Sequence, residues 1–165
     1  MKFRLLLLDA NIVIYLHELG LWDTFIQQCS VTLTQTVVDE VLSYDLGPDI
    51  RDRKIQCVEV PLATVAKFIK KYGPVYLEKL DPGEAESLAF LMDSQEQWLI
   101  SSGDEIVFKV LGLEGRVEQG ISLEEILNKI GMTQSNLKKW YTKAFRDNVT
   151  RKGQIDGVTG FGHST

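Results

Sequence analysis

The chain has 165 residues, of which 44% are hydrophobic and 25% are charged, and these values fit one globular domain that folds without disulfides. The formal net charge of −5 argues against a general nucleic-acid-binding surface, because phosphate contacts require Lys and Arg. Cys29 and Cys57 form no CxxC pair, and His17 and His163 are isolated, so neither a disulfide framework nor a zinc site is expected.

The N-terminal segment combines two basic residues with four leucines, as a secretory signal peptide does. Asp9 and Asn11 interrupt the apolar run, however, and no small-residue cleavage site follows. We therefore expect a cytoplasmic protein with no membrane partner.

Strands and helices are predicted to alternate along the first two thirds of the chain. Short apolar or β-branched runs predict strands over residues 3–8, 31–34, 57–60 and 98–101. Apolar residues at helical spacing predict helices over residues 12–19, 37–46, 62–78, 81–93 and 106–112. The glycine at 20 and the Gly-Pro pairs at 47–48 and 73–74 predict helix ends or breaks. This alternation predicts an α/β protein of three layers (α/β/α), with helices on both faces of a central parallel sheet.

The pattern changes after residue 115, so we expect a first domain over residues 1–115 and a helical C-terminal extension over 116–151. Ser122 and Glu125 form a predicted capping box at the start of a helix over 122–131. A second amphipathic helix is predicted around 137–145. The glycine-rich segment 152–165 has little hydrophobic periodicity and is predicted to be a flexible tail.

The extension carries a basic segment with one acid, Asp147, among six basic residues: Lys138, Lys139, Lys143, Arg146, Arg151 and Lys152. Such a run commonly forms a solvated helix face, and contact with phosphates is the alternative. Trp140, Tyr141 and Phe145 lie in the same segment, where packing is the commoner role of aromatic residues and stacking on bases is the alternative.

Four acidic residues are predicted to meet at the carboxyl edge of the sheet, where parallel α/β proteins bind their ligands. Asp9 directly follows the first strand, and Asp104 follows the strand at 98–101. Glu40 and Glu84 are able to reach the same edge from their helices. Because four ionised carboxylates repel one another, the cluster predicts a cation, and oxygen ligands favour Mg²⁺ or Mn²⁺ over zinc.

Each of these residues also has a structural alternative. Helix capping is a sufficient role for several polar residues of the cluster: Asp9, Asn11, Glu84 paired with Asp81, and Asp104. Asp39 and Glu40 flank the buried stripe of their helix almost symmetrically, so periodicity does not choose between them.

The order and spacing of four segments resemble the PIN domain: LLLLDANIVI, VVDEVL, DPGEAESLAFL and LISSGDEIVFKVLGL. The resemblance covers roughly residues 3–115 and implies a metal-dependent nuclease, most often an endoribonuclease and, in prokaryotes, often the toxin of a toxin–antitoxin pair. It implies an acidic quartet of catalytic and metal-binding residues: Asp9, Glu40, Glu84 and Asp104. It thereby favours Glu40 over Asp39.

The chain departs from the family pattern before Asp104, where many members have Asp or Thr and this chain has Ser101-Ser102-Gly103. The position of the fourth ligand is therefore open by about one residue, with Asp81 and Glu86 as alternatives. The residues that would orient a water molecule or a carboxylate are Asn11, Ser101 and Ser102.

The resemblance implies that one or two Mg²⁺ or Mn²⁺ ions activate water and stabilise charge at the phosphorus. The expected partners are an RNA substrate, an antitoxin protein that inserts Arg or Lys into the acidic site, and a second copy of the chain in a homodimer. Contact with the RNA backbone is then assigned to four basic residues: Lys138, Lys139, Lys143 and Arg146. Two other hypotheses stay open: a PIN-like module with weak or no catalysis that binds RNA or a protein, and a phosphotransfer domain in which Asp9 accepts the phosphoryl group.

Overall fold

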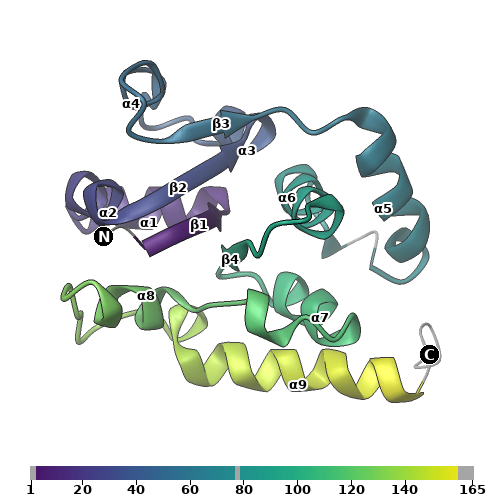
Figure 1. Ribbon diagram of the computed structural model, residues 1–165. Coiled ribbons are helices and arrows are strands. Elements are labelled where there is room, and N and C mark those ends of the chain that lie inside the picture. Colours follow the sequence, from purple (N-terminus) through teal and green to yellow (C-terminus); the bar gives the residue numbers. More distant parts are fainter. Residues whose placement is uncertain (1–2, 77–78, 160–165) are drawn as a thin grey trace.

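A parallel sheet of four strands, in the order β3-β2-β1-β4, forms the centre of the structure (Figure 1). The computed structural model describes residues 3–76 and 79–159. The strands are β1 (Phe3–Leu8), β2 (Cys29–Thr34), β3 (Gln56–Val58) and β4 (Leu99–Ser101). Beyond β4, Gly120 adds a single parallel bridge to Ile100. The predicted α/β class and parallel sheet are confirmed.

Helices occupy most of the chain between and after the strands. They are α1 (Ala10–Glu18), α2 (Trp22–Gln28), α3 (Gln35–Glu40), α4 (Gly47–Arg51), α5 (Leu62–Tyr76), α6 (Pro82–Asp93), α7 (Glu105–Leu113), α8 (Leu123–Lys129) and α9 (Lys143–Thr159). Two 3₁₀ turns, η2 (Val117–Gln119) and η3 (Lys139–Tyr141), lie among the last of them. Within the described ranges, no helix has both the length and the apolar character needed to cross a bilayer.

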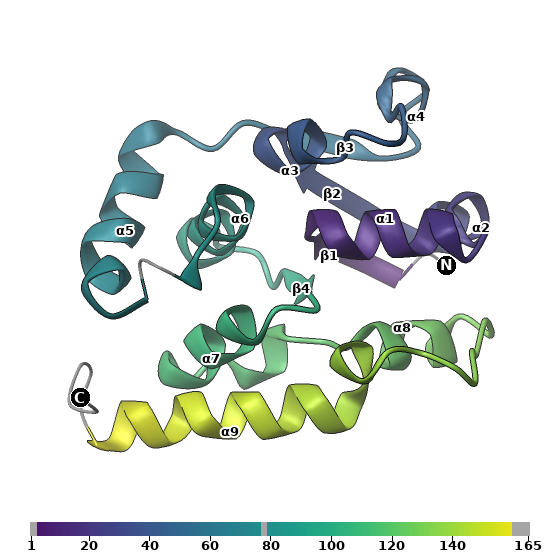
Figure 2. The same ribbon diagram turned by 180° about the vertical axis from the view of Figure 1, so that it is seen from behind.

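The sheet separates two hydrophobic cores because successive side chains of β1 point to opposite faces. Leu6 and Leu8 belong to a core formed with α1, α2 and α8, whereas Leu7 belongs to a core formed with α5, α6, α7 and α9. All three leucines are fully buried. The helix α1 lies behind the sheet in Figure 1 and in front of it in Figure 2. The arrangement is compatible with a three-layer α/β/α fold.

Two predicted helix boundaries between β2 and β4 are wrong. The helix α3 ends at Glu40 instead of continuing to the Gly-Pro pair at 47–48, and this pair begins α4, where proline suits the first turn. The predicted break at 73–74 is absent, and α5 is continuous to its last residue. Tyr72 and Tyr76 are both buried in the second core, so tertiary packing stabilises this last turn in spite of the proline.

The C-terminal segment is also more ordered than its composition predicts, since α9 continues to Thr159 where a flexible tail was predicted from residue 152. A Cβ atom on Gly153 would lie 2.0 Å from the Lys109 carbonyl oxygen, and one on Gly112 would lie 2.1 Å from the Thr150 carbonyl oxygen. The glycines therefore allow α7 and α9 to pack backbone against backbone. Residues 160–165 of the predicted tail lie outside the described residues.

The extension packs on the same sheet as the first domain. Leu123, Ile126 and Leu127 of α8 are fully buried in the first core, and Val149 of α9 is buried in the second. The helix predicted around 137–145 is instead η3 followed by the start of α9, with Thr142 as the residue between them. Residues 116–159 thus complete both cores.

The contact between α7 and α9 predicts that Gly153→Ala destabilises the protein. The methyl group cannot fit beside the Lys109 carbonyl, so α9 must move, and such overpacking costs about 1–3 kcal/mol, which exceeds the gain of about 1 kcal/mol from alanine's helix propensity. The free energy of unfolding in urea measures the effect. Asn148→Ala, at an exposed position of the same helix, is the control and is expected to be neutral or stabilising. Equal loss in both variants would contradict the proposed packing.

Candidate functional site

Acidic side chains from separate elements converge at the carboxyl edge of the sheet. Asp9, Glu40 and Glu84 line one cleft of about 40 Å³, whose other lining residues are Ala10, Asn11, Val37, Asp81 and Gly83. This volume exceeds the roughly 10–15 Å³ that one water molecule requires. Asp104 does not line the cleft, but its side chain interacts with Glu84, which does. The structure thus places the four predicted acids in one region, three of them in the same cleft.

Asp9 is held at the end of β1 by the strand register. Leu8 pairs with Ser101 of β4, so Ser102 lies beside Asp9. The Ser102 hydroxyl donates a hydrogen bond to Asp9 Oδ2, and the Ile12 amide donates to Asp9 Oδ1 over 3.0 Å. The residue is 5% exposed, and its burial raises the pKa of Asp9 from 3.8 to about 6 against the lowering effect of both hydrogen bonds. Asp9 is therefore both the cap of α1 and a buried acid facing the cleft.

Glu84 and Asp104 interact with each other across the ends of α6 and α7. Glu84 forms a capping box with Asp81, because the Asp81 amide donates to Glu84 Oε1 over 3.1 Å and the Glu84 amide donates to Asp81 Oδ1 over 2.9 Å. Burial, and then a hydrogen bond with the Asp104 side chain, raise the pKa of Glu84 well above its usual range. Asp104 also caps α7 at the Ile106 amide, over 3.3 Å. Glu84 and Asp104 thus cap their helices, as predicted, and their side chains also lie close together, as predicted.

Glu40 reaches the cleft because Gly83 has no side chain. A Cβ atom on Gly83 would lie 2.1 Å from Glu40 Oε1. This oxygen is buried and has no hydrogen-bond partner of good geometry in the described part of the chain, although the Gly83 amide is near enough to lower the pKa of Glu40. Burial and the nearby Asp81 and Asp9 outweigh that effect and raise this pKa. A buried oxygen without a well-aligned donor in the described part of the chain is the feature of the cleft that a cation or a bound water would satisfy.

The acid next to Glu40 lies outside the cleft. Asp39 is exposed and accepts a hydrogen bond from Gln35 Nε2 over 2.9 Å. The choice that periodicity left open is therefore made by the packing of α3 against α6, in favour of Glu40. Of the two alternative acids, Asp81 lines the cleft, whereas Glu86 accepts a hydrogen bond from the Thr36 hydroxyl.

The predicted orienting residues differ in position. Asn11 is exposed on the rim of the cleft. Ser102 bridges two elements, since its hydroxyl donates to Asp9 and accepts the Asp104 amide over 2.9 Å. Ser101 is fully buried, and its hydroxyl has no partner among the described residues. Gly83 was not among the predicted site residues, and its signal in the sequence is the glycine in the first turn of the helix that carries Glu84.

The donor chemistry of the cleft fits a hard cation, although a complete ligand cage is not formed. All donors are oxygen atoms, the space holds more than one water molecule, and Glu40 Oε1 is unsatisfied. Within residues 3–76 and 79–159, however, no group of three or more His, Cys, Asp or Glu side chains has the arrangement of a metal site. Mg²⁺ and Mn²⁺ thus suit the residues by type and charge rather than by preformed geometry.

Only some of the predicted RNA-binding cations are available. Arg146 forms a bidentate ion pair with Glu125, at 2.9 and 3.1 Å, and its side chain is largely buried. Lys143 pairs with Asp147 at 2.8 Å. Lys138 and Lys139 are exposed and take part in no ion pair with the described residues.

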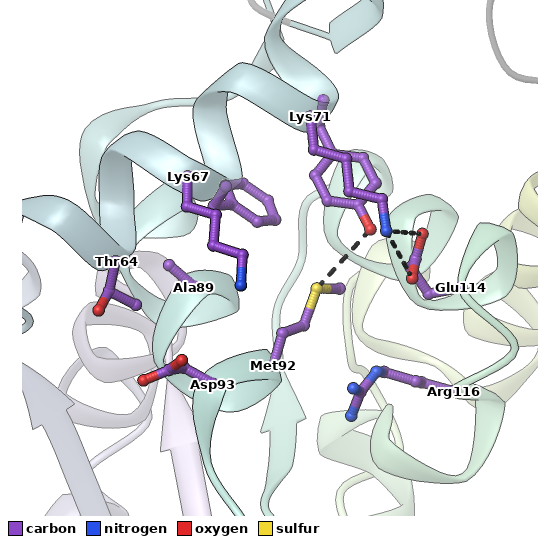
Figure 3. Close-up of a pocket in the computed structure, with 10 residues that line it drawn as sticks. Thr64, Lys67, Lys71, Ala89, Met92, Asp93, Glu114 and Arg116 are labelled. Carbon is purple, nitrogen blue, oxygen red and sulfur yellow. Dashed lines mark hydrogen bonds and ion pairs between the residues drawn. The ribbon is translucent and has the colours of Figure 1, made fainter.

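A second cavity, of about 190 Å³, lies between α5, α6 and the turn after α7 (Figure 3). Phe68 and Tyr72 are among its lining residues, and Lys71, which also lines it, pairs with Glu114 at 3.1 Å. Its charged residues are of both signs and are not arranged as a cluster of acids. In this respect it differs from the first cleft, whose charged lining residues are all acidic.

Comparison with known proteins supplies no relative for this site. No family model matches the chain, and a search of curated proteins found no match. The similarity to the PIN domain accordingly rests on the order and spacing of the chain's own segments.

The buried carboxyl group of Asp9 predicts a pH-dependent gain of stability in Asp9→Asn. The pKa of Asp9 in the folded protein, about 6, lies above the ordinary aspartate value of 3.8, so folding favours the protonated form. The ionised form therefore destabilises the protein increasingly as the pH rises through about 6. The variant is expected to gain up to about 3 kcal/mol in the free energy of unfolding above about pH 7, and nothing below about pH 4. Urea unfolding in EDTA across this range measures the gain. Asp39→Asn removes an exposed acid and should show no such trend; a pH-independent difference for Asp9→Asn would refute the assignment.

Proposed function

We propose that this protein is a metal-dependent endoribonuclease of the PIN type, which hydrolyses phosphodiester bonds in RNA. The observation that carries the proposal is the convergence of Asp9, Glu40 and Glu84 on one cleft with Asp104 beside it. Structural capping accounts for Asp9, Glu84 and Asp104, whereas the buried oxygen of Glu40 has no hydrogen bond of good geometry in the described residues and only approaches the Gly83 amide at the start of α6. An additional positive ligand accounts for all four.

In this proposal Asp9, Glu40, Glu84 and Asp104 would hold Mg²⁺ or Mn²⁺, and the bound ion would activate water and stabilise negative charge on the phosphate. The other residues position these acids. The Ser102 hydroxyl fixes the orientation of Asp9, and the glycine at 83 leaves room for Glu40. Asn11, on the rim, is placed to contact a phosphate or a water molecule.

The proposal extends to a role as the toxin of a toxin–antitoxin pair. The cleft is small and acidic, so an Arg or Lys side chain of an antitoxin would neutralise it by charge-assisted hydrogen bonds. A homodimer would be compatible with this role. Both statements rest on the resemblance in sequence.

A second candidate function is a PIN-like module that binds RNA or a protein with weak or no catalysis. It is favoured by the hydrogen bond between Glu84 and Asp104 and by the lack of a formed ligand cage in the described residues. The two candidates differ in whether RNA is cut, so one experiment separates them.

Cleavage of RNA is expected to require metal and Asp9. A mixed pool of single-stranded and structured RNA is incubated with the protein in Mg²⁺, Mn²⁺ or EDTA, and the products are separated by electrophoresis. Asp9→Asn is expected to lower the rate by about 100-fold, as the loss of an oriented metal ligand does. Asp39→Asn changes the same charge outside the cleft and should retain the wild-type rate. Folded wild-type protein that leaves the RNA intact with both metals would favour the binding module.

Metal binding is expected to depend on the space at Gly83. In Gly83→Ala the new methyl group displaces the Glu40 carboxylate, so the affinity for Mn²⁺, measured by electron paramagnetic resonance, should fall by about 10- to 100-fold. Gly47→Ala is the matched control, since Gly47 also lies in the first turn of a helix and the atoms nearest to its Cβ would belong to the flexible side chains of Asp45 and Arg51. Equal Mn²⁺ affinity in the two variants would show that Glu40 is not a ligand.

A further inference from the structure

Two aromatic side chains pack directly on the turn that carries part of the acidic site. Gly103 lies between Ser102, which holds Asp9, and Asp104. A Cβ atom on Gly103 would lie 2.5 Å from Tyr141 Cε1 and 2.8 Å from Trp140 Cδ1. The absence of this Cβ brings both rings next to the site.

The two rings differ in what they leave open to solvent. Tyr141 is 5% exposed and stacks on Tyr15, with ring centroids 4.6 Å apart, so packing accounts for it. Trp140 is 38% exposed, although its ring is held against Tyr141, with centroids 6.1 Å apart, and against the backbone of Gly103. An indole that is held by its neighbours and still more than one third exposed presents a preformed apolar surface.

The cations beside Trp140 have no carboxylate partners among the described residues. Lys138 Nζ lies 5.3 Å from the ring centroid of Tyr15 and 5.6 Å from that of Trp140. These cation–π contacts hold the ammonium group in place and leave donors free for an anion. Lys139 is exposed next to it. An open aromatic ring with adjacent unpaired cations matches a base with its neighbouring phosphates better than it matches an apolar protein segment.

We propose that Trp140 stacks on a base of single-stranded RNA while Lys138 and Lys139 bind the adjoining phosphates, which positions the next part of the backbone at the acidic cleft. The inference rests on the proposed nuclease function and names its substrate class. An acidic cleft repels RNA, so attraction must come from its surroundings. Stacking of a base on an exposed aromatic ring favours binding whatever the base sequence. Duplex RNA keeps its bases stacked inside the helix and cannot supply one to the indole.

Tryptophan fluorescence tests the stacking without any cleavage. Trp22 and Trp98 are buried, at 3% and 7% exposure, so a surface ligand quenches chiefly Trp140. The full chain in EDTA is titrated with a short oligouridylate, with an abasic ribose-phosphate oligomer of equal length, and with duplex RNA. We expect the oligouridylate to quench the fluorescence and to bind more tightly than the other two. Trp140→Ala should weaken oligouridylate binding, followed by anisotropy of a labelled oligomer, by about 5- to 100-fold, and Trp140→Phe should restore most of it.

The salt dependence of the same binding tests the two lysines. Replacing Lys138 and Lys139 by Ala should lower the slope of log affinity against log salt by about 0.7 for each phosphate that the variant no longer binds. Lys54→Ala is the control: this exposed lysine precedes β3 at the opposite edge of the sheet, and its replacement should leave the slope unchanged.

The results separate this inference from the proposed function. Fluorescence quenching and base-dependent binding by a protein that never cuts RNA would support stacking on Trp140 and overturn the proposed nuclease function. Metal-dependent cleavage with unchanged KM in Trp140→Ala would support the nuclease function and overturn stacking on Trp140. Stacking on Trp140 would also be overturned if the abasic oligomer or duplex RNA bound as tightly as the oligouridylate, or if no RNA bound at all.

Discussion

The burial of one carboxyl group at the end of the central strand is the constraint on which the candidate site depends. β1 lies between β2 and β4, and its described leucine side chains are fully buried, so the strand end has a single position in the fold. Asp9 follows that strand directly and is enclosed with it, which raises its pKa to about 6. Ser102 compensates part of this cost by donating a hydrogen bond from the neighbouring strand end. Asp9 thus caps α1 although its ionised form is costly to bury.

Missing side chains determine how closely the surrounding elements approach. At Gly83 the gap admits the Glu40 carboxylate, and at Gly103 it admits the rings of Trp140 and Tyr141. At Gly112 and Gly153 it allows α7 and α9 to pack through their backbones. Glycines at close contacts therefore shape the acidic cleft, place an aromatic surface beside it, and allow the C-terminal helix to pack on α7.

The charges of the protein are separated over a short distance. Acids are concentrated in the cleft, where they raise one another's pKa, and the chain as a whole has a net charge of −5. In the basic segment, Arg146 joins α9 to α8 through Glu125, and Lys143 pairs with Asp147 within α9. Lys138 and Lys139 are left at the rim. A nuclease with an acidic centre needs such a division, because the residues that bind metal repel the substrate that the rim must attract.

Local patterns in the sequence determined the strand cores, the alternation of strands and helices, the capping boxes of α6 and α8, and the edge of the sheet at which the acids would meet. These features follow from hydrogen bonds and burial among residues close in sequence. Periodicity did not choose between Asp39 and Glu40; the resemblance favoured Glu40, and the tertiary structure places Glu40 at the cleft. Only the tertiary structure decided that Trp140 is partly exposed while Tyr141 is buried, and that α9 extends to Thr159. Each of these outcomes depends on a close approach, at a glycine, between elements that are distant in sequence. Hydrophobic periodicity does not reveal such a contact, because glycine has no side chain.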